Sequence, residues 1–325
     1  MAWDSIIGQE LAKRILQEHL ATARVAQAYL LAGPEGVGKR LLALEMAKAL
    51  NCALQASEAC DACHSCVSIA RGVHPDVHGL SVEADADRIK IDAVRQMLSR
   101  IALRPFNANV SVVILDGVER LTEEAANALL KSLEEPPAHA RFILITSVLS
   151  GCLPTIVSRC QIIRCPGLNP QIVAEFLKGH SCDEKTAGYL SVLSCGSLSR
   201  AMAWASEWEG YQRLLARFEA TGPSVWLEEK LPETRKDLTW ALDGMVMWLR
   251  DVAFVASDGA SWVLHADRAK VLDEQAQSMD VDLCVETAFQ LLALRESLEQ
   301  FVSPRLVATL AREQWLCLLT GLLQK

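Results

Sequence analysis

The sequence predicts an α/β domain with a parallel sheet, followed by an all-helical second half. Up to about residue 165, apolar runs of strand length alternate with amphipathic helical segments, a pattern typical of a parallel sheet covered by helices. Beyond Pro166 the strand signals stop, and seven of the eight tryptophans fall after residue 200. We therefore expect a sheet domain over residues 1–166, a small helical domain over 167–207 and a larger helical domain over 208–325.

The expected strands are β-favouring apolar runs bounded by turn or polar residues. They are Ala28–Ala32, Val77–Val82, Val110–Leu115, Phe142–Thr146 and Gln161–Cys165. Between the third and fourth strands, Thr122 predicts the N-cap of a helix that stops before Pro136. Ligands of such sheets bind at the carboxyl ends of the strands, so functional residues are sought there.

Amphipathic stripes predict the helices of the second half. The clearest stripe follows the i, i+3, i+4, i+7 rule and comprises Leu238, Ala241, Leu242, Met245, Trp248, Leu249 and Val252. Ser303 and Pro304 supply an N-cap and a first-position proline for the last helix. These stripes fit the core of a helical bundle, and a surface that also joins other subunits stays open as an alternative.

Composition narrows the function classes. Hydrophobic residues make up 51% and charged residues 22% of 325 residues, which is typical of a globular chain. We expect a cytoplasmic protein without a membrane segment, because no apolar stretch is long enough to cross a bilayer. The net charge of −8 argues against strong autonomous binding to nucleic acid.

A glycine-rich segment after the first strand has the spacing of a phosphate-binding loop. Gly33, Gly36 and Gly38 let backbone N–H groups surround phosphate oxygens, and Lys39 is placed for the β- and γ-phosphates. The next residue should be a serine or threonine that ligates Mg²⁺, but it is Arg40. The loop therefore resembles a nucleotide site that lacks the hydroxyl needed for hydrolysis. Whether it still binds a nucleotide stays open.

A second loss falls on the same function. The strand that ends at Asp116 matches the Walker B pattern, in which the aspartate holds Mg²⁺. An active enzyme of this layout follows that aspartate with a glutamate that polarises water, and here the residue is Gly117. Glu119 is interpreted as a surface charge. We do not expect this chain to hydrolyse ATP.

Four cysteines form a compact C-x7-C-x2-C-x2-C group after the helix that follows the loop: Cys52, Cys60, Cys63 and Cys66. Four thiolates suit tetrahedral zinc and leave no open ligand position, so the metal is expected to be structural. An iron–sulfur cluster and unligated thiols are the alternatives, although the ferredoxin continuation x3-C-P is absent. His64 could replace one cysteine as a ligand, but we expect it to be an exposed loop residue.

Several segments together resemble one family. Residues 33–39, the helix and Pro-Pro segment of residues 125–137, the strand at 142–146 and residues 154–160, which end in Ser-Arg-Cys, are similar to the clamp-loader AAA+ ATPases. The resemblance covers most of residues 1–210. It implies an AAA+ P-loop sheet domain with a zinc module, an all-helical lid and an all-helical collar.

The resemblance also implies roles for individual residues. Arg159 would be an arginine finger that reaches into the ATP site of a neighbouring subunit. Thr146 would occupy the sensor 1 position and Arg200 the sensor 2 position, and residues 7–10 would lie near the adenine. Arg95 and Arg100 would face DNA on the helical segment 88–103, although a solvated helix face is an equal reading.

At the level of function, the resemblance implies a subunit of the bacterial DNA polymerase III clamp loader. The γ/τ subunits keep the serine or threonine and the glutamate, whereas the δ′ group loses them, so the two losses favour the δ′ group. Implied partners are γ/τ and δ in a heteropentamer that loads the sliding β clamp on primer–template DNA, within the polymerase holoenzyme. The alternatives are a γ/τ-like or independent ATPase and a stand-alone zinc protein that acts on nucleic acid.

Overall fold

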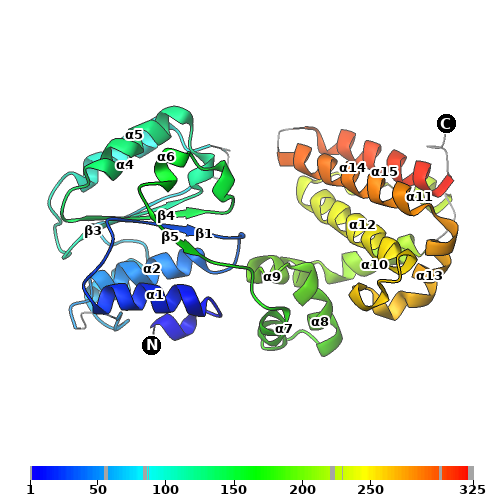
Figure 1. Ribbon diagram of the computed structural model, residues 1–325, viewed down its shortest axis with the longest axis horizontal. Coiled ribbons are helices and arrows are strands. Elements are labelled where there is room, and N and C mark those ends of the chain that lie inside the picture. The colour runs from blue at the N-terminus through cyan, green and yellow to red at the C-terminus, as the bar shows by residue number, and fades with distance from the viewer. Residues whose placement is uncertain are drawn as a thin grey trace. The chain divides into compact units, whose positions relative to one another are not determined.

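The protein is described by a computed structural model (Figure 1) that covers residues 2–54, 58–82, 86, 88–219, 224–228, 230–299 and 302–320. It divides into two compact units, residues 1–203 and 204–325. Among the described residues, every helix is too short or too polar to cross a lipid bilayer.

The first unit contains a five-stranded sheet in which every pairing is parallel. Its strands are β1 (Ala28–Ala32), β2 (Val77–Leu80), β3 (Ser111–Asp116), β4 (Ala140–Thr146) and β5 (Gln161–Arg164). They lie in the order β2-β3-β4-β1-β5. The expected five strands and parallel sheet are thus confirmed, with ends that differ by one or two residues from the apolar runs.

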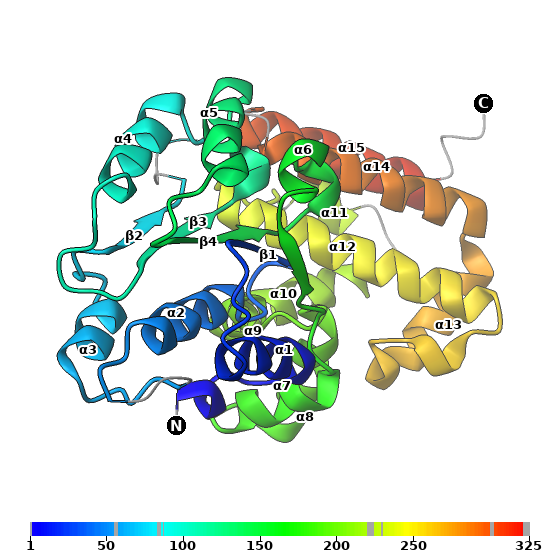
Figure 2. The same cartoon turned by 60° about the vertical axis from the view of Figure 1, so that its left-hand side comes forward.

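Helices cover both faces of this sheet (Figures 1 and 2). One face carries α1 (Glu10–Ala21), α2 (Lys39–Leu50) and α3 (His64–Ala70), and the other carries α4 (Ile91–Ile101), α5 (Glu123–Glu134) and α6 (Pro154–Val157). Alternate residues of the central strands β3, β4 and β1 enter the two cores: Tyr29 and Leu31 pack toward α1 and α2, whereas Leu30 packs toward α4 and α5. A strand buried on both faces reads as a continuous apolar run, because successive side chains point to opposite faces.

The expected helix after Thr122 is present and ends before the two prolines. The Thr122 hydroxyl accepts a hydrogen bond from the Ala125 N–H at 3.3 Å, as an N-cap should. The helical segment expected over residues 88–103 is shorter in the structure, since α4 spans Ile91–Ile101. Short 3₁₀ turns lie at Ala2–Ser5, Val118–Arg120 and Leu149–Gly151.

Three helices complete the first unit: α7 (Pro170–Lys178), α8 (Glu184–Leu193) and α9 (Leu198–Ser206), which runs across its boundary. They correspond to the expected small helical domain. The two-unit division groups α7, α8 and the start of α9 with the sheet, so the separate lid over 167–207 stays a prediction.

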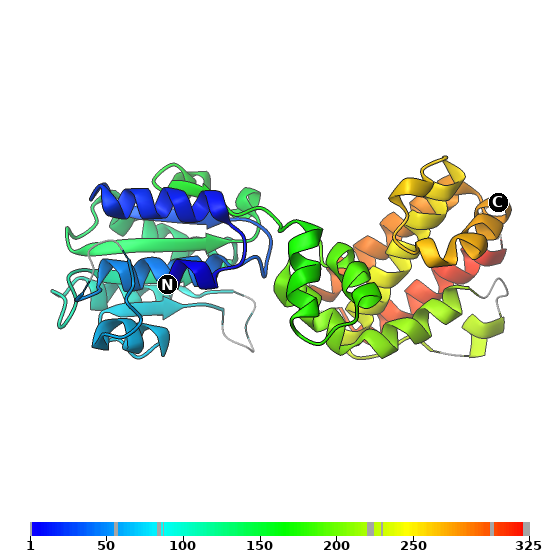
Figure 3. The same ribbon diagram turned by 90° about the horizontal axis from the view of Figure 1, so that it is seen from below.

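The described residues of the second unit form helices joined by loops, and no strand occurs among them. Its helices are α10 (Trp208–Phe218), α11 (Ser224–Glu228), α12 (Arg235–Ala256), α13 (Ala269–Ser278), α14 (Val281–Glu299) and α15 (Pro304–Thr320), with 3₁₀ turns at Ala260–Trp262 and Ala266–Arg268. The long helices α12, α14 and α15 lie side by side (Figures 1 and 3). All seven residues of the predicted stripe on α12 are buried. Phe218, Trp226, Trp248 and Trp315 form an aromatic cluster with ring centroids 5.1–5.8 Å apart.

A polar network lies inside this helical unit. The fully buried Asp251 carboxylate accepts hydrogen bonds from the His265 ring at 2.7 Å and from the backbone N–H groups of Leu264 and His265. The other ring nitrogen of His265 lies 2.7 Å from the hydroxyl of Tyr211. Burial alone would raise the pKa of Asp251, but these hydrogen bonds outweigh burial and lower it.

We expect Asp251→Ala to lower the free energy of unfolding by roughly 3 kcal/mol or more, because each buried donor left without an acceptor costs about 1–3 kcal/mol. In the unchanged chain the stabilisation by Asp251 is present above its unfolded pKa of about 3.9 and is lost as the pH falls toward the lower folded value. Denaturant titration followed by tryptophan fluorescence measures both effects. Asp273→Ala, at an exposed position of α13, is the control; equal unfolding of the two variants would contradict the expectation.

Candidate functional site

The phosphate-binding loop connects β1 to α2 and depends on its glycines. A Cβ atom on Gly33 would lie 1.7 Å from the Cys165 carbonyl oxygen, so no larger residue fits without moving the backbone. Gly36 has φ 74° and Gly38 has φ 100°, in the left-handed region that glycine adopts without strain. The loop therefore keeps the backbone shape that its sequence spacing predicts.

Lys39 is the first residue of α2 and is almost fully buried. Its ammonium donates hydrogen bonds to the carbonyl oxygens of Gly33 and Pro34, each at 2.6 Å. Burial lowers the pKa of Lys39, and the neighbouring carboxylates, Asp116 first, oppose that shift. The ammonium is thus held inside the loop at the place where a phosphate would bind.

Arg40 points to the Walker B aspartate. Its Nη1 lies 3.7 Å from Oδ2 of Asp116, which is an ion pair rather than a short hydrogen bond. Burial raises the pKa of Asp116, and the cations of Arg40 and Lys39 oppose that shift. A guanidinium therefore faces the carboxylate that would hold Mg²⁺ in an active enzyme of this layout.

Gly117 follows Asp116 with φ 88°. A glutamate at this position would need a left-handed backbone that side chains rarely adopt. The absence of the water-polarising carboxylate is therefore accompanied by a backbone conformation that favours glycine.

Glu119 is not the surface charge that the sequence suggested. It is half-buried and lines the cavity described below, and its Oε1 accepts a hydrogen bond from the Ser147 N–H at 3.0 Å. Its Oε2 is buried without a hydrogen-bond partner. The chain turns into a 3₁₀ segment after Asp116 instead of continuing as a strand, and this turn directs Glu119 inward. No periodicity in the sequence could have revealed it.

A cavity of 780 Å³ opens beside the loop and carries both charged and apolar side chains. Cations and anions balance, since three of each line it: Lys39, Arg40, Arg120, Glu35, Asp116 and Glu119. Apolar lining comes from Ile7, Leu44, Phe176 and Met202 among others. The volume falls within the range of about 300–1,000 Å³ typical of small-molecule sites.

The structure brings only some of the predicted nucleotide-site residues to this cavity. Gly36, Gly38, Lys39 and Asp116 line it, as does Ile7 of the N-terminal segment, whereas Gly33, Thr146 and Arg200 are not among its lining residues. The Thr146 side chain is fully buried, and its hydroxyl accepts hydrogen bonds from the Val148 N–H and the Cys152 thiol. The backbone N–H of Arg200 donates a hydrogen bond to the Ser197 hydroxyl, just before the start of α9.

The segment with Ser197 closes against the loop. Its Leu198 N–H donates to the Gly36 carbonyl at 3.1 Å. A Cβ on Gly36 would lie 2.3 Å from the Ser197 hydroxyl oxygen. On the other side, the Gln9 amide donates to the carbonyls of Val37 and Pro166. Gly36 is thus needed for the close packing of this segment against the loop.

Arg159 lies just beyond α6, with its side chain 35% exposed. Its Nη2 lies 2.5 Å from Oε1 of Glu134, at the end of α5, and its Nη1 donates to the Thr155 carbonyl at 2.9 Å. Glu134 lies within residues 125–137, which carry part of the family resemblance, but only the fold shows that it pairs with Arg159. The guanidinium is accessible at the surface of the first unit.

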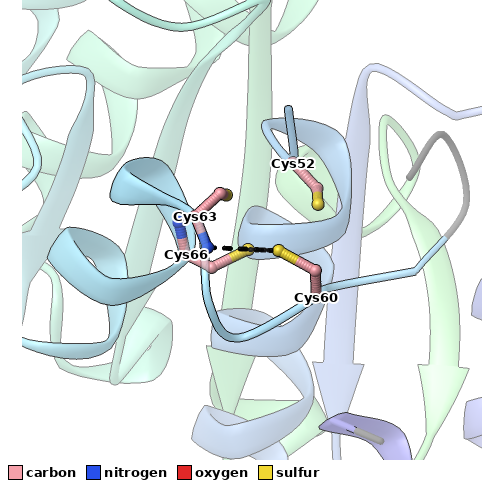
Figure 4. Close-up of side chains that lie close together, drawn as sticks. All are labelled: Cys52, Cys60, Cys63 and Cys66. Atoms are coloured by element: carbon pink, nitrogen blue, oxygen red, sulfur yellow. Dashed lines mark hydrogen bonds between the residues drawn. The ribbon is translucent and has the colours of Figure 1, made fainter. Parts of the chain in front are cut away.

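The four predicted cysteine ligands come together, as Figure 4 shows. Cys52 follows the C-terminus of α2, and Cys63 and Cys66 lie at the start of α3. The four sulfur atoms all lie within 4.8 Å of one another, and in tetrahedral zinc sites with Zn–S bonds of about 2.3 Å the sulfurs are about 3.8 Å apart. The cluster can hold a metal ion. His64 is exposed and is not part of the cluster among the described residues.

The cysteine module is tied to the helix that begins at the phosphate loop. Lys48 of α2 pairs with Glu45 on the same helix and with Asp61 between the cysteines, the latter at 2.6 Å. Asn51 at the helix end accepts a hydrogen bond from the Val110 N–H. The cysteine cluster is therefore joined to α2 by side-chain contacts as well as by the chain itself.

Comparison with known proteins adds to this geometry. A family model described as DNA polymerase III, delta subunit, matches residues 8–169. The chain is 42% identical to the DNA polymerase III subunit delta' of Pseudomonas aeruginosa over 145 residues, which are 44% of each protein. It is 33% identical to the subunit gamma of Buchnera aphidicola from Schizaphis graminum over 209 residues, 62% of this chain and 56% of the relative.

The chain thus spans about half the length of the curated relatives it matches. A solved structure, the gamma subunit-related protein of Thermotoga maritima, is 20% identical with a TM-score of 0.40, and covers 87% of this chain and 99% of that one. The parallel sheet, the glycine loop, the Walker B strand and the sequence matches agree with one another. The chain belongs to the clamp-loader family of AAA+ proteins.

Proposed function

We propose that this chain is a non-hydrolysing δ′-type subunit of the DNA polymerase III clamp loader. The observation that carries the proposal is the Arg40–Asp116 pair, in which a guanidinium faces the carboxylate that would hold Mg²⁺ in an active enzyme of this layout. Without the metal, the charge that develops during phosphoryl transfer has no counterion in the expected place. Relatives named gamma, tau and delta' all match the chain, so the choice among them rests on this site.

The proposed active contribution is made by Arg159 to a neighbouring γ/τ subunit. A guanidinium presents a planar fork of donors that suits the oxygens of a transferring phosphoryl group. The Arg159 side chain is partly exposed and forms an ion pair with Glu134 that solvent weakens. Such a side chain can extend from its own subunit toward a neighbour. The chain would supply an arginine finger to a neighbouring ATP site, although its own pocket lacks the residues needed for ATP hydrolysis.

We propose that the four cysteines hold structural zinc. Four sulfur ligands complete the tetrahedron, so a bound zinc ion would have no position for water and would take no part in hydrolysis. Its role would be to fix the segment that joins α2 to α3, with ligands from Cys52 after α2 to Cys66 in the first turn of α3. The assignment rests on the thiol donor set and the sulfur separations.

The second unit offers a surface for assembly with γ/τ and δ. On α14, Val285, Phe289 and Leu292 are 42%, 68% and 38% exposed at i, i+4, i+7 spacing, and Leu306 and Leu310 on α15 are also exposed. An apolar stripe of this kind is typical of a protein interface. The proposed partners are therefore other helical collars, and the sliding β clamp and primed DNA would be met through the complex.

A contact with DNA would use α4. Arg95 and Arg100 are exposed on this helix, where they could meet backbone phosphates without reading sequence. A cytoplasmic location belongs to the same proposal.

A γ/τ-like active ATPase is the second candidate, and Glu119 is the observation that favours it. This carboxylate lines the cavity with one oxygen lacking a hydrogen-bond partner. A carboxylate in that position could polarise water in place of the residue lost at Gly117.

We expect the purified chain to show no ATP hydrolysis above background with Mg·ATP, whereas enzymes typically turn over at about 1 s⁻¹ or faster. Phosphate release measured over hours separates the two candidates. Glu119→Gln is the matched variant: if the chain does hydrolyse ATP and this change abolishes the activity, the second candidate replaces the first.

A further inference from the structure

The site does not fit the metal that its fold class uses, and this disagreement leads to an inference that rests on the proposed function. Mg²⁺ requires a near-octahedral set of oxygens at about 2.0–2.1 Å. Position 40 offers a cation instead of a hydroxyl, and the Asp116 carboxylate faces that cation at 3.7 Å. A divalent ion here would lie beside two positive side chains, Lys39 and Arg40, and would have lost one ligand.

We infer that the pocket binds a nucleoside di- or triphosphate without a divalent cation, with Arg40 in the place of the metal. The loop and its cavity retain what a polyphosphate needs. Gly36 and Gly38 keep their left-handed backbone, and the N-terminus of the twelve-residue helix α2 follows directly, with N–H groups that favour anions. The cavity of 780 Å³ is large enough for a nucleotide, and Ile7, Phe176 and Met202 supply apolar surface for a base.

Arg40 can take the place of the metal because of how it is held. Its side chain is 61% exposed and its ion pair with Asp116 is long, so a small rotation lets it meet phosphate oxygens. A guanidinium binds such oxygens through two parallel hydrogen bonds, a geometry that lysine cannot offer. Asp116 then acts as a positioning residue for Arg40 and no longer as a metal ligand.

Lys39 completes the phosphate site. Its ammonium has three N–H donors and spends two of them on the Gly33 and Pro34 carbonyls. A phosphate oxygen can take the third donor, or can replace one of the carbonyls. Lys39 and Arg40 would together offset part of the ligand's charge that Mg²⁺ offsets in an active enzyme.

The test is equilibrium binding of fluorescent mant-ADP and mant-ATP to the full chain, once with Mg²⁺ and once with EDTA. We expect dissociation constants that agree within about twofold between the two buffers, a difference of about 0.4 kcal/mol. Arg40→Thr restores a hydroxyl and removes the cation. This variant should bind at least tenfold more weakly in EDTA, because it loses the charge-assisted hydrogen bonds of the guanidinium. It should regain part of that loss with Mg²⁺, because threonine restores a hydroxyl ligand for the metal.

Two further variants control the result. Lys39→Ala should abolish binding in both buffers. Arg71→Ala, at an exposed position away from the cavity lining, should leave both dissociation constants unchanged. Circular dichroism checks that each variant is folded, which we expect for Arg40→Thr because the side chain is largely exposed.

Three outcomes would overturn the inference: no binding in either buffer, wild-type binding strengthened tenfold or more by Mg²⁺, or an Arg40→Thr variant that behaves like the wild type in EDTA. A chain that binds no nucleotide would leave the proposed function intact, since the arginine of the trans mechanism lies elsewhere. Turnover of Mg·ATP by the isolated chain would instead remove the proposed function itself.

Discussion

Arg159→Ala should strongly reduce the ATPase activity of the clamp loader reconstituted with γ/τ and δ from the same source. An arginine finger supplied in trans accelerates phosphoryl transfer by about 10³–10⁵-fold. The site that Arg159 completes should therefore become nearly silent, and total turnover should fall to what the remaining sites sustain. Steady-state phosphate release with primed DNA and clamp present measures the loss.

The variant itself should fold and assemble normally. Arg159 is partly exposed and its ion pair with Glu134 is solvated, and such pairs contribute about 0–1 kcal/mol. Size-exclusion chromatography of the reconstituted complex checks assembly. Arg164→Ala removes another exposed arginine of the same unit, on β5, and should keep full activity.

Glu134→Gln sharpens the interpretation. It removes the carboxylate that holds Arg159 in the isolated chain without removing the guanidinium. Activity of the complex should stay near the wild-type level, because the finger needs that partner only before it engages the neighbouring site. If Arg159→Ala leaves turnover unchanged, Arg159 acts only as a surface residue, and the role in trans is wrong.

Loss of the metal should produce the second large effect. Structural zinc contributes apparent binding free energies of about 10–16 kcal/mol in small zinc peptides, which is comparable to the whole stability of a typical domain, about 5–15 kcal/mol. Cys63→Ser removes one of four ligands, so we expect loss of bound zinc and a lower thermal unfolding midpoint of the first unit. Elemental analysis and circular dichroism measure the two changes.

The location of the cysteines makes the effect reach beyond their own loop. Cys52 directly follows α2, and Lys48 links that helix to Asp61 inside the module, so loosening the module should loosen the helix that begins at Lys39. Tryptophan fluorescence reports mainly the second unit, which contains seven of the eight tryptophans, and should change little.

Cys195→Ser is the matched control for this experiment, because Cys195 is an exposed free thiol outside the cluster. It should keep one equivalent of zinc and the wild-type midpoint. A chain purified with no zinc, or a Cys63→Ser variant as stable as the control, would contradict a structural zinc site.

Much of the fold was predictable because its signals are local. Each buried strand reads as a short apolar run, and Thr122 together with Pro136 sets the limits of α5. The stripe on α12 is periodic, and all its members are buried. The ends of the strands and the start of α4 were predicted less well. A strand ends where its hydrogen-bonded pairing with the neighbouring strand ends, and the bounds of a helix vary by one or two residues, so neither is set by the local sequence alone.

The sequence by itself determined the family, the glycine loop, the cysteine cluster and the two substitutions at positions 40 and 117, because motif spacing is a property of the chain alone. Only the tertiary structure decided that Arg40 faces Asp116, that Glu119 turns into the cavity and that Glu134 holds Arg159. The two members of the Arg40–Asp116 pair, and of the Glu134–Arg159 pair, come from different helices and strands or from the turns beside them. The position of Glu119 depends on the turn that ends its strand. Their geometry is set by how the sheet and helices pack, and no spacing along the chain encodes it.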